Sequence, residues 1–115
     1  MKLRVLLLPL LVAAVGLTVV PLAAPQTKAT TVTVTAKEFK FVLSTKTAKA
    51  GAITFKVTNK GKIAHDFKIA GKKTPLLQPG KSTTLKVTLK KGSWPYKCTV
   101  DAHAAAGMKG TFKAI

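Results

Sequence analysis

The segment Thr31-Val32-Thr33-Val34-Thr35-Ala36 alternates small apolar side chains with threonine. Residues 53–58 repeat the alternation as Ile-Thr-Phe-Lys-Val-Thr. Because successive side chains of a β-strand point to opposite faces, this period of two is typical of strands with one buried face and one face in water. The two segments therefore predict a β-sheet that packs one of its faces against a core.

The same alternation continues through most of the chain after residue 30. Apolar side chains recur at every second position in seven runs, which are residues 32–36, 39–43, 53–57, 63–69, 85–89, 94–100 and 108–114. Turn-forming residues lie between several runs, and Pro79-Gly80 fits the middle of a type II turn. No segment keeps a helical period. We therefore predict an all-β, Greek-key β-sandwich of about seven strands, built from two packed antiparallel sheets.

The first residues have a different composition. Met1 to Arg4 are basic at two of four positions, and residues 5–20 are almost continuously apolar. This is the layout of a secretory signal peptide, for which Ala23, Ala24 and Ala29 offer small residues near a cleavage point. The apolar stretch also approaches the roughly 20 residues that a membrane helix needs.

Residues 1–24 are therefore predicted to be a signal peptide or an uncleaved membrane anchor, helical in either case. Residues 25–115 are predicted to be one folded domain. A lipid anchor is not expected, because the only cysteine of the chain is Cys98. We expect an exported protein, in the periplasm or at the outer face of the cell membrane, with membrane association through the amino-terminal segment as an open alternative.

The charge of the chain is strongly positive, with 20 basic residues, three acidic residues and a net charge of +17. Lys2 and Arg4 alone precede residue 25, so residues 25–115 keep 18 lysines and a net charge of +15. Such a field steers a protein toward anionic surfaces. Nucleic-acid binding proteins usually rely on arginine and exposed aromatic rings, and residues 25–115 contain no arginine. We expect an acidic partner protein, and no nucleic acid.

Four side chains can bind a metal ion and are rare in this chain. Cys98 is the only cysteine, His65 and His103 are the only histidines, and Met108 is one of two methionines. A single cysteine in an exported chain cannot form an internal disulfide, which suggests another use for its thiol. His65 and Cys98 occupy inward positions of the runs 63–69 and 94–100. His103 and Met108 fall on the loop between the last two runs.

Each of these residues alone has an ordinary structural explanation, as a core cysteine, a hydrogen-bonded histidine, a loop histidine or a core methionine. Their combination is more specific, because one short loop carries Cys, His and Met in order. Two imidazoles, a thiolate and a weak axial thioether suit copper that changes between Cu(I) and Cu(II). Zinc prefers four firm ligands, and methionine is a poor fourth. We predict one copper ion bound by His65, Cys98, His103 and Met108.

The run from Cys98 to Gly110 resembles the copper loop of the cupredoxins, the small type 1 blue copper proteins that include plastocyanin and azurin. The resemblance covers about residues 30–115 and matches the four predicted ligands to the copper ligands of the family. Asn59, six residues before His65, is similar to an asparagine of plastocyanin-like chains. The sequence Gly107-Met108-Lys109-Gly110 matches the usual end of the loop.

Two features depart from the family pattern. Four residues separate Cys98 from His103, as in azurin-like loops, and four separate His103 from Met108, as in plastocyanin. Asp66 stands where many members carry asparagine; it can accept hydrogen bonds from Thr99 but cannot donate one. Asp101 adds a second carboxylate near the site, and we expect it, more than Asp66, to be simply solvated.

The resemblance implies a one-electron carrier between redox partners. We expect a monomer that is not an enzyme, because the four ligand positions leave no open place for a substrate. His103, beside Ala104 to Gly107, is expected to lie in a small apolar patch where an acidic redox partner docks. Two alternatives remain open at this stage: a protein that stores or delivers copper without transferring electrons, and a metal-free basic sandwich that adheres to a surface.

Overall fold

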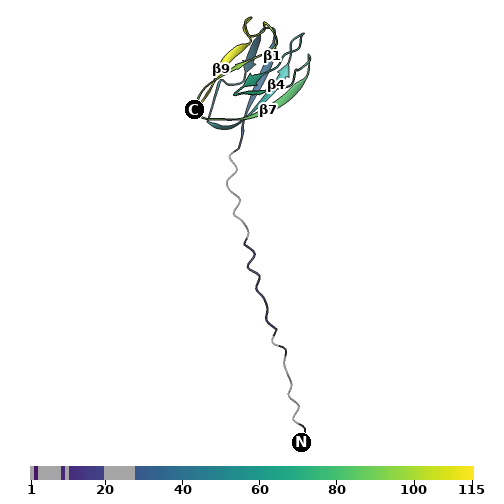
Figure 1. Ribbon diagram of the computed structural model, residues 1–115, viewed down its shortest axis with the longest axis vertical. Helices are drawn as coiled ribbons and strands as arrows, with labels where there is room; N and C mark the ends of the chain where they lie inside the picture. Colours follow the sequence, from purple (N-terminus) through teal and green to yellow (C-terminus); the bar gives the residue numbers. More distant parts are fainter. Residues whose placement is uncertain (1, 3–8, 10, 20–27) are drawn as a thin grey trace.

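The computed structural model describes residues 2, 9, 11–19 and 28–115, and Figure 1 shows a β-sandwich formed by the last of these ranges. The described residues contain nine strands and no helix. The strands are β1 (Thr30–Lys37), β2 (Lys40–Leu43), β3 (Thr47–Ala48), β4 (Gly51–Asn59), β5 (Lys68–Ile69), β6 (Lys72–Lys73), β7 (Ser82–Leu89), β8 (Gly92–Lys97) and β9 (Lys109–Ala114). The predicted all-β sandwich is thus confirmed, with two-residue strands added to the long runs.

The strands form two sheets, in the orders β2-β1-β4-β7 and β3-β9-β8-β5-β6. β1 pairs with β4 in parallel, and β3 pairs with β9 in parallel, whereas the other neighbours are antiparallel. The expectation of purely antiparallel sheets is therefore wrong. The chain passes from β2 to β3 in the other sheet before it returns as β4, and this crossover brings β4 back in the direction of β1.

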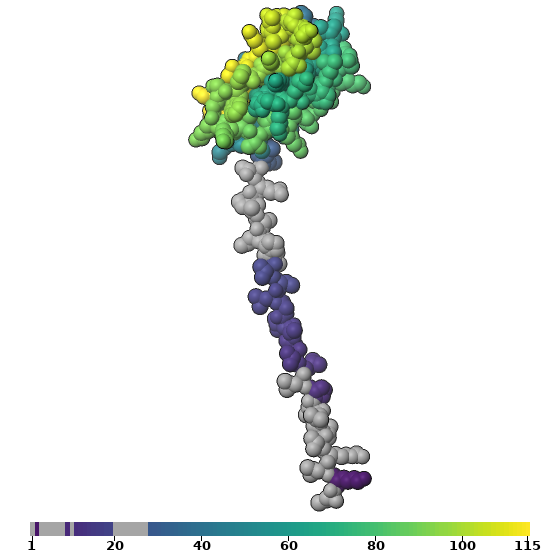
Figure 2. Space-filling view, in the orientation of Figure 1, coloured from purple at the N-terminus to yellow at the C-terminus, as the bar shows by residue number. Residues whose placement is uncertain are grey.

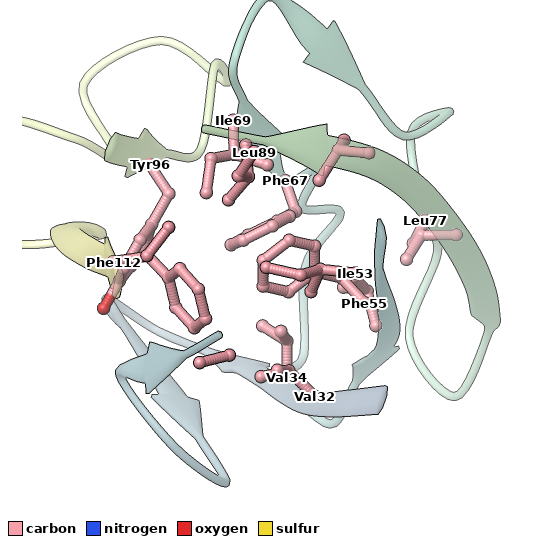
Figure 3. Packing of buried hydrophobic residues seen from close by; sticks show 14 residues of the cluster. Val32, Val34, Ile53, Phe55, Phe67, Ile69, Leu77, Leu89, Tyr96 and Phe112 are labelled. Atoms are coloured by element: carbon pink, nitrogen blue, oxygen red, sulfur yellow. The ribbon is translucent and has the colours of Figure 1, made fainter. Parts of the chain in front are cut away.

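The core lies between the sheets and is formed by the alternate apolar positions that the sequence marks. Phe55 of β4 is fully buried, and its ring centroid lies 5.3 Å from those of both Phe67 and Phe112 (Figure 3). Phe112 belongs to β9 of the opposite sheet, so these aromatic contacts join the two layers. The inward positions of β1 and β4 are buried as expected, namely Val32, Val34, Ala36, Ile53, Phe55 and Val57.

The run 63–69 is a strand only at its end. β5 covers Lys68–Ile69, and His65 takes part in a single isolated bridge to Leu77. Ile63, expected to point inward, is 44% exposed. The reason is that the backbone N–H of Ile63 donates to the carboxylate of Glu38 instead of a neighbouring strand.

Two other strand predictions need correction at their ends. Phe39 was expected to begin an inward-facing run, but it forms the β1–β2 turn with Glu38 and is 41% exposed. β8 ends at Lys97, so Cys98 lies directly after the strand instead of inside it. Its backbone N–H bonds to the carbonyl of Met108 at 3.0 Å, which keeps the two ends of the following loop together.

The type II turn predicted at Pro79-Gly80 is confirmed. Gly80 has a φ of 81°, which the third residue of such a turn requires. The backbone N–H of Lys81 donates to the carbonyl of Gln78 at 3.0 Å and closes the turn.

The amino-terminal segment differs from its helical prediction where it is described. Residues 11–19 have no regular secondary structure, and their apolar side chains are exposed, as Leu11 is at 92%. Most of the stability of a helix in a protein comes from packing one of its faces, and the side chains of residues 11–19 are exposed. The rest of residues 1–24, apart from Lys2 and Pro9, lies outside the described residues. Among the described residues, no helix has the length and apolarity needed to cross a membrane.

Replacing Phe55 by alanine tests the inter-sheet core. Removing a fully buried ring should lower the free energy of unfolding by about 3–5 kcal/mol, because a cavity replaces its contacts with Phe67 and Phe112. Urea denaturation of the purified protein measures this. Val42→Ala, at a side chain that is 53% exposed, should cost less than about 1 kcal/mol. Equal losses for the two variants would contradict this placement of the core.

Candidate metal centre

Three connections meet at one end of the sandwich: the β1–β2 turn, the β4–β5 loop and the β8–β9 loop. Figure 2 shows the yellow-green residues of the carboxyl-terminal part gathered at this end, beside the teal residues of the middle of the chain. The β8–β9 loop carries Cys98, His103 and Met108, and the β4–β5 loop carries His65. Residues far apart in the sequence are thus brought together here.

The two histidines and the cysteine form one buried group. His65 Nδ1 lies 3.1 Å from His103 Nδ1, and Cys98 Sγ lies 3.6 Å from the same His103 atom. All three candidate ligand atoms lie within 4.8 Å of one another. His65 is fully buried, Cys98 is 1% exposed and His103 is 7% exposed. Three atoms at these separations could bind a single metal ion together.

Met108 lies beside this group. It is fully buried and packs in a small apolar cluster with Cys98 and Ala36. Its carbonyl accepts the hydrogen bond from the Cys98 backbone. The structure therefore places the fourth predicted residue next to the thiol, and its use as a ligand stays a prediction.

The β8–β9 loop is a compact series of turns closed by its own backbone. The N–H of His103 donates to Val100 and the N–H of Met108 donates to His103, both at 3.1 Å. Ala106 donates to the carbonyls of Ala102 and His103 at 3.0 and 3.1 Å. These bonds fix the spacing between His103 and Met108.

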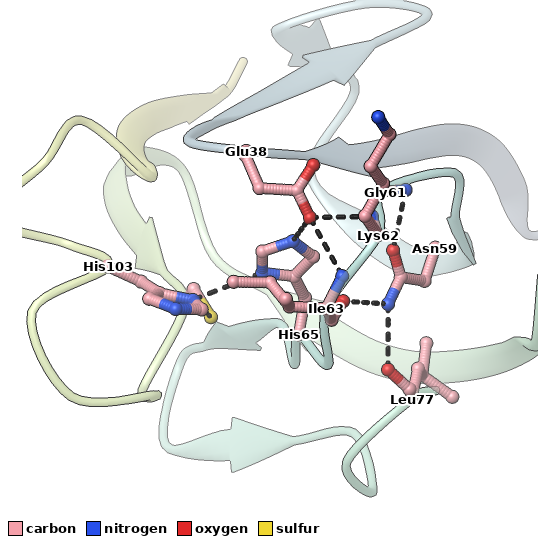
Figure 4. Close-up of polar contacts among 9 residues, drawn as sticks. Glu38, Asn59, Gly61, Lys62, Ile63, His65, Leu77 and His103 are labelled. Atoms are coloured by element: carbon pink, nitrogen blue, oxygen red, sulfur yellow. Dashed lines mark hydrogen bonds and ion pairs between the residues drawn. The ribbon is translucent and has the colours of Figure 1, made fainter. Parts of the chain in front are cut away.

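The β4–β5 loop is fixed by Asn59. Its side-chain amide donates to the carbonyls of Ile63 and Leu77, and its side-chain oxygen accepts from the N–H of Gly61, each at 2.8 Å (Figure 4). Leu77 in turn exchanges two backbone hydrogen bonds with His65, at 2.8 and 3.1 Å. One buried amide thus holds the segment that carries His65 against its neighbour.

Asp66 joins the two ligand-bearing loops. Its carboxylate accepts from the backbone N–H of Thr99 at 2.6 Å and from the Thr99 hydroxyl. Asp66 is 4% exposed, whereas Asp101 is exposed. The expected difference between the two carboxylates is therefore confirmed. Thr99 donates both bonds, so the link between the loops is kept although aspartate cannot donate.

Glu38 also contacts the site, although no motif in the sequence marks it. Its Oε1 accepts from the backbone N–H of Lys62 at 2.7 Å and of Ile63 at 3.0 Å, and it lies 3.1 Å from His65 Nε2 (Figure 4). Hydrogen bonds lower the pKa of Glu38 from 4.5 to about 2. The largest effect comes from the Ile63 backbone, followed by smaller ones from the backbone of Glu38 and of Lys62 and from the His65 side chain. The sequence offered one signal for this role. Glu38 is one of only three acidic residues in the chain, and it lies between two alternating runs.

The thiol of Cys98 is held in its neutral form. Burial raises its pKa, and this effect outweighs the backbone N–H groups of Asp66 and Val100, which act in the opposite direction. Burial therefore favours the protonated thiol over the thiolate. Among the described residues, every buried side-chain nitrogen and oxygen atom has a hydrogen-bond partner, so the site is ordered as a polar network.

A β-sandwich with two histidines and a cysteine buried at one end is an arrangement typical of small metal-binding proteins. The sequence matches the family described as "Cupredoxin-like domain" over residues 9–112. The chain therefore belongs to the cupredoxin family, as its copper-loop motif predicts. A search among curated proteins finds no significant sequence match.

Solved structures share the fold at low sequence identity. Dithionite-reduced auracyanin from Roseiflexus castenholzii is 24% identical with a TM-score of 0.66, covering 76% of this chain and 98% of its own. Auracyanin A from Chloroflexus aurantiacus, described as a "blue" copper protein, is 17% identical with a TM-score of 0.64, covering 76% and 100%. An azurin from Methylomonas sp. strain J is 18% identical with a TM-score of 0.61, covering 76% and 99%. At these identities the likeness shows the fold alone.

Replacing Asn59 by aspartate tests how the His65 loop is held. Aspartate keeps the shape but cannot donate to Ile63 and Leu77, so the Ile63 carbonyl loses this donor and the buried Leu77 carbonyl keeps only the backbone N–H of His65. We expect the free energy of unfolding to fall by about 2 kcal/mol or more. Thermal or urea denaturation of the metal-free protein measures this. Thr58→Ser, at the partly exposed neighbouring position, is the control, and a similar loss there would contradict the assigned role of Asn59.

Proposed function

We propose that this protein is an exported type 1 copper protein that carries single electrons between redox partners. His65, Cys98 and His103 would bind the ion, with Met108 as a weak fourth ligand. The observation that carries the proposal is the burial of three ligand atoms within 4.8 Å of one another. Cupredoxin family membership, with auracyanin A as a "blue" copper relative in structure, supports the same conclusion.

The donor set favours copper over other ions. A thiolate and two imidazoles suit copper, and the adjacent thioether of Met108 completes a set in which zinc would lack a firm fourth ligand. No carboxylate is part of the buried group of His65, Cys98 and His103. Ions that prefer oxygen ligands, such as magnesium and calcium, are therefore poor candidates.

The surrounding residues suit electron transfer because they hold the ligands in place. Copper, when bound, would supply a centre that accepts and releases one electron. The hydrogen bonds of Asn59, Asp66 and the β8–β9 loop hold the ligand-bearing segments to one another, so the ligands would need little rearrangement when the charge of the ion changes. His103 is the most exposed of the three grouped residues, at 7%, and would form the shortest route to a partner.

The exposed residues around His103 form a docking surface at this end of the molecule. Phe39, 41% exposed, contacts the His103 ring edge-on at a centroid distance of 5.1 Å, and Ile63 is 44% exposed. Exposed lysines flank these positions in the sequence, including Lys40, Lys60 and Lys62. An apolar centre with a cationic border favours an acidic redox partner and short encounters. Export, a monomeric state and membrane association through the amino-terminal segment are parts of the same proposal.

A copper titration of the wild type and Cys98→Ser tests the proposal. We expect the wild type to bind one Cu(II) ion and to develop intense sulfur-to-copper charge-transfer absorption in the visible range. The serine variant should lack this absorption because it has no thiolate. A colourless wild type would contradict the assignment. Rapid loss of the ion to a chelator, with no reversible redox couple, would instead favour copper delivery.

Proton release provides an independent test of the thiolate ligand. Because burial raises the pKa of Cys98, copper binding must remove its proton, and the affinity should fall as the pH decreases. At pH 7 to 8 we expect about one proton more per bound ion for the wild type than for Cys98→Ser. Titration in a weakly buffered solution with a pH indicator measures the difference. Equal release by the two proteins would exclude the thiolate as a ligand.

A further inference from the structure

We propose that Glu38 is a positioning residue for the copper site, which holds His65 with its Nε2 protonated and its Nδ1 free to bind the ion. This inference rests on the proposed copper-binding function. It assigns a role to a carboxylate on the β1–β2 turn, 27 residues before the histidine that it contacts.

The carboxylate of Glu38 is held in place by several contacts. Two backbone N–H groups, those of Lys62 and Ile63, donate to its Oε1 at 2.7 and 3.0 Å, and His65 Nε2 lies 3.1 Å from the same oxygen. Gly61 leaves the space for it, since a Cβ atom there would collide with the Glu38 side chain. The carboxylate is therefore held by the segment that carries His65 and not only by the histidine itself.

The identity of the acceptor decides where the His65 proton lies. An ionised carboxylate can only accept, so the His65 nitrogen facing it must carry hydrogen. In a neutral imidazole the other nitrogen then has a free electron pair. That atom is Nδ1, which lies 3.1 Å from His103 Nδ1 and belongs to the group with Cys98. Glu38 thus selects the tautomer that a metal ion needs.

The turn itself is firmly placed. Lys37 and Lys40 form the last pair of the β1–β2 ladder, so Glu38 and Phe39 form a two-residue turn between them. The ring of the next residue, Phe39, packs edge-on against the ring of His103, with 5.1 Å between the ring centroids. One short turn therefore touches both histidines, Glu38 through a charged hydrogen bond and Phe39 through packing.

The negative charge should also affect the redox state. A carboxylate that accepts from a metal-bound histidine makes the imidazole a stronger donor. A stronger donor stabilises Cu(II) relative to Cu(I), so the charge of Glu38 lowers the reduction potential. Glu38→Gln keeps an oxygen acceptor and removes the charge, whereas Glu38→Ala removes both.

The position of the proton can be measured in the metal-free full-length protein by nitrogen NMR of the histidine rings. We expect His65 of the wild type to carry hydrogen on Nε2 alone, and His65 of Glu38→Ala to populate both tautomers. A wild-type His65 protonated on Nδ1, or unchanged by Glu38→Ala, would overturn the proposal. This readout does not depend on copper, so it fails separately from the proposed function.

The copper-loaded proteins give the second readout. Glu38→Ala should lose about 10- to 100-fold in copper affinity, and Glu38→Gln should recover most of it but show a higher reduction potential than the wild type. Asp101→Asn removes an exposed carboxylate two residues from His103 and is the charge control. An equal rise in potential for Asp101→Asn, or no rise for Glu38→Gln, would overturn the electronic role of Glu38.

Discussion

The central constraint on this end of the molecule is that two imidazoles and a thiol are held close together in a buried position. Polar groups that leave water lose hydrogen bonds, and this loss must be offset by new partners. His65, Cys98 and His103 lie at distances that suit a shared ion, and the two Nδ1 atoms face one another at 3.1 Å. The sandwich provides a rigid base, but the three connections at its end must also be held in fixed positions relative to one another.

Three polar side chains hold these loops together, because each one bonds to a segment other than its own. Asn59 ties the His65 loop to the segment of Leu77, and Asp66 ties the same loop to Thr99 beside Cys98. Glu38 adds the β1–β2 turn to the network through Lys62 and His65. Each of these residues satisfies several donors or acceptors at once, so the loss of one would leave several groups unpaired. We therefore regard the network and the ligand group as one unit.

Much of the fold could be predicted because burial follows the alternation of side chains. The inward residues of β1 and β4 and the aromatic centre at Phe55 agree with the sequence pattern. The pattern failed at Phe39 and Ile63, both exposed at the functional end. There the backbone makes a turn or bonds to a side chain, and alternation no longer reports which way a residue points. Parallel pairing of β1 with β4 was also missed, since it depends on how the chain crosses between sheets.

The identities and order of the metal-binding side chains are local properties, and Cys, His and Met on one loop already suggest copper chemistry. The alternation is local too, which is why the class of fold could be inferred. The contact of Glu38 with His65 is of another kind, because the two residues are 27 positions apart and meet only when the β1–β2 turn packs over the β4–β5 loop. The tautomer of His65, and the direction in which its free nitrogen points, are consequences of that packing alone.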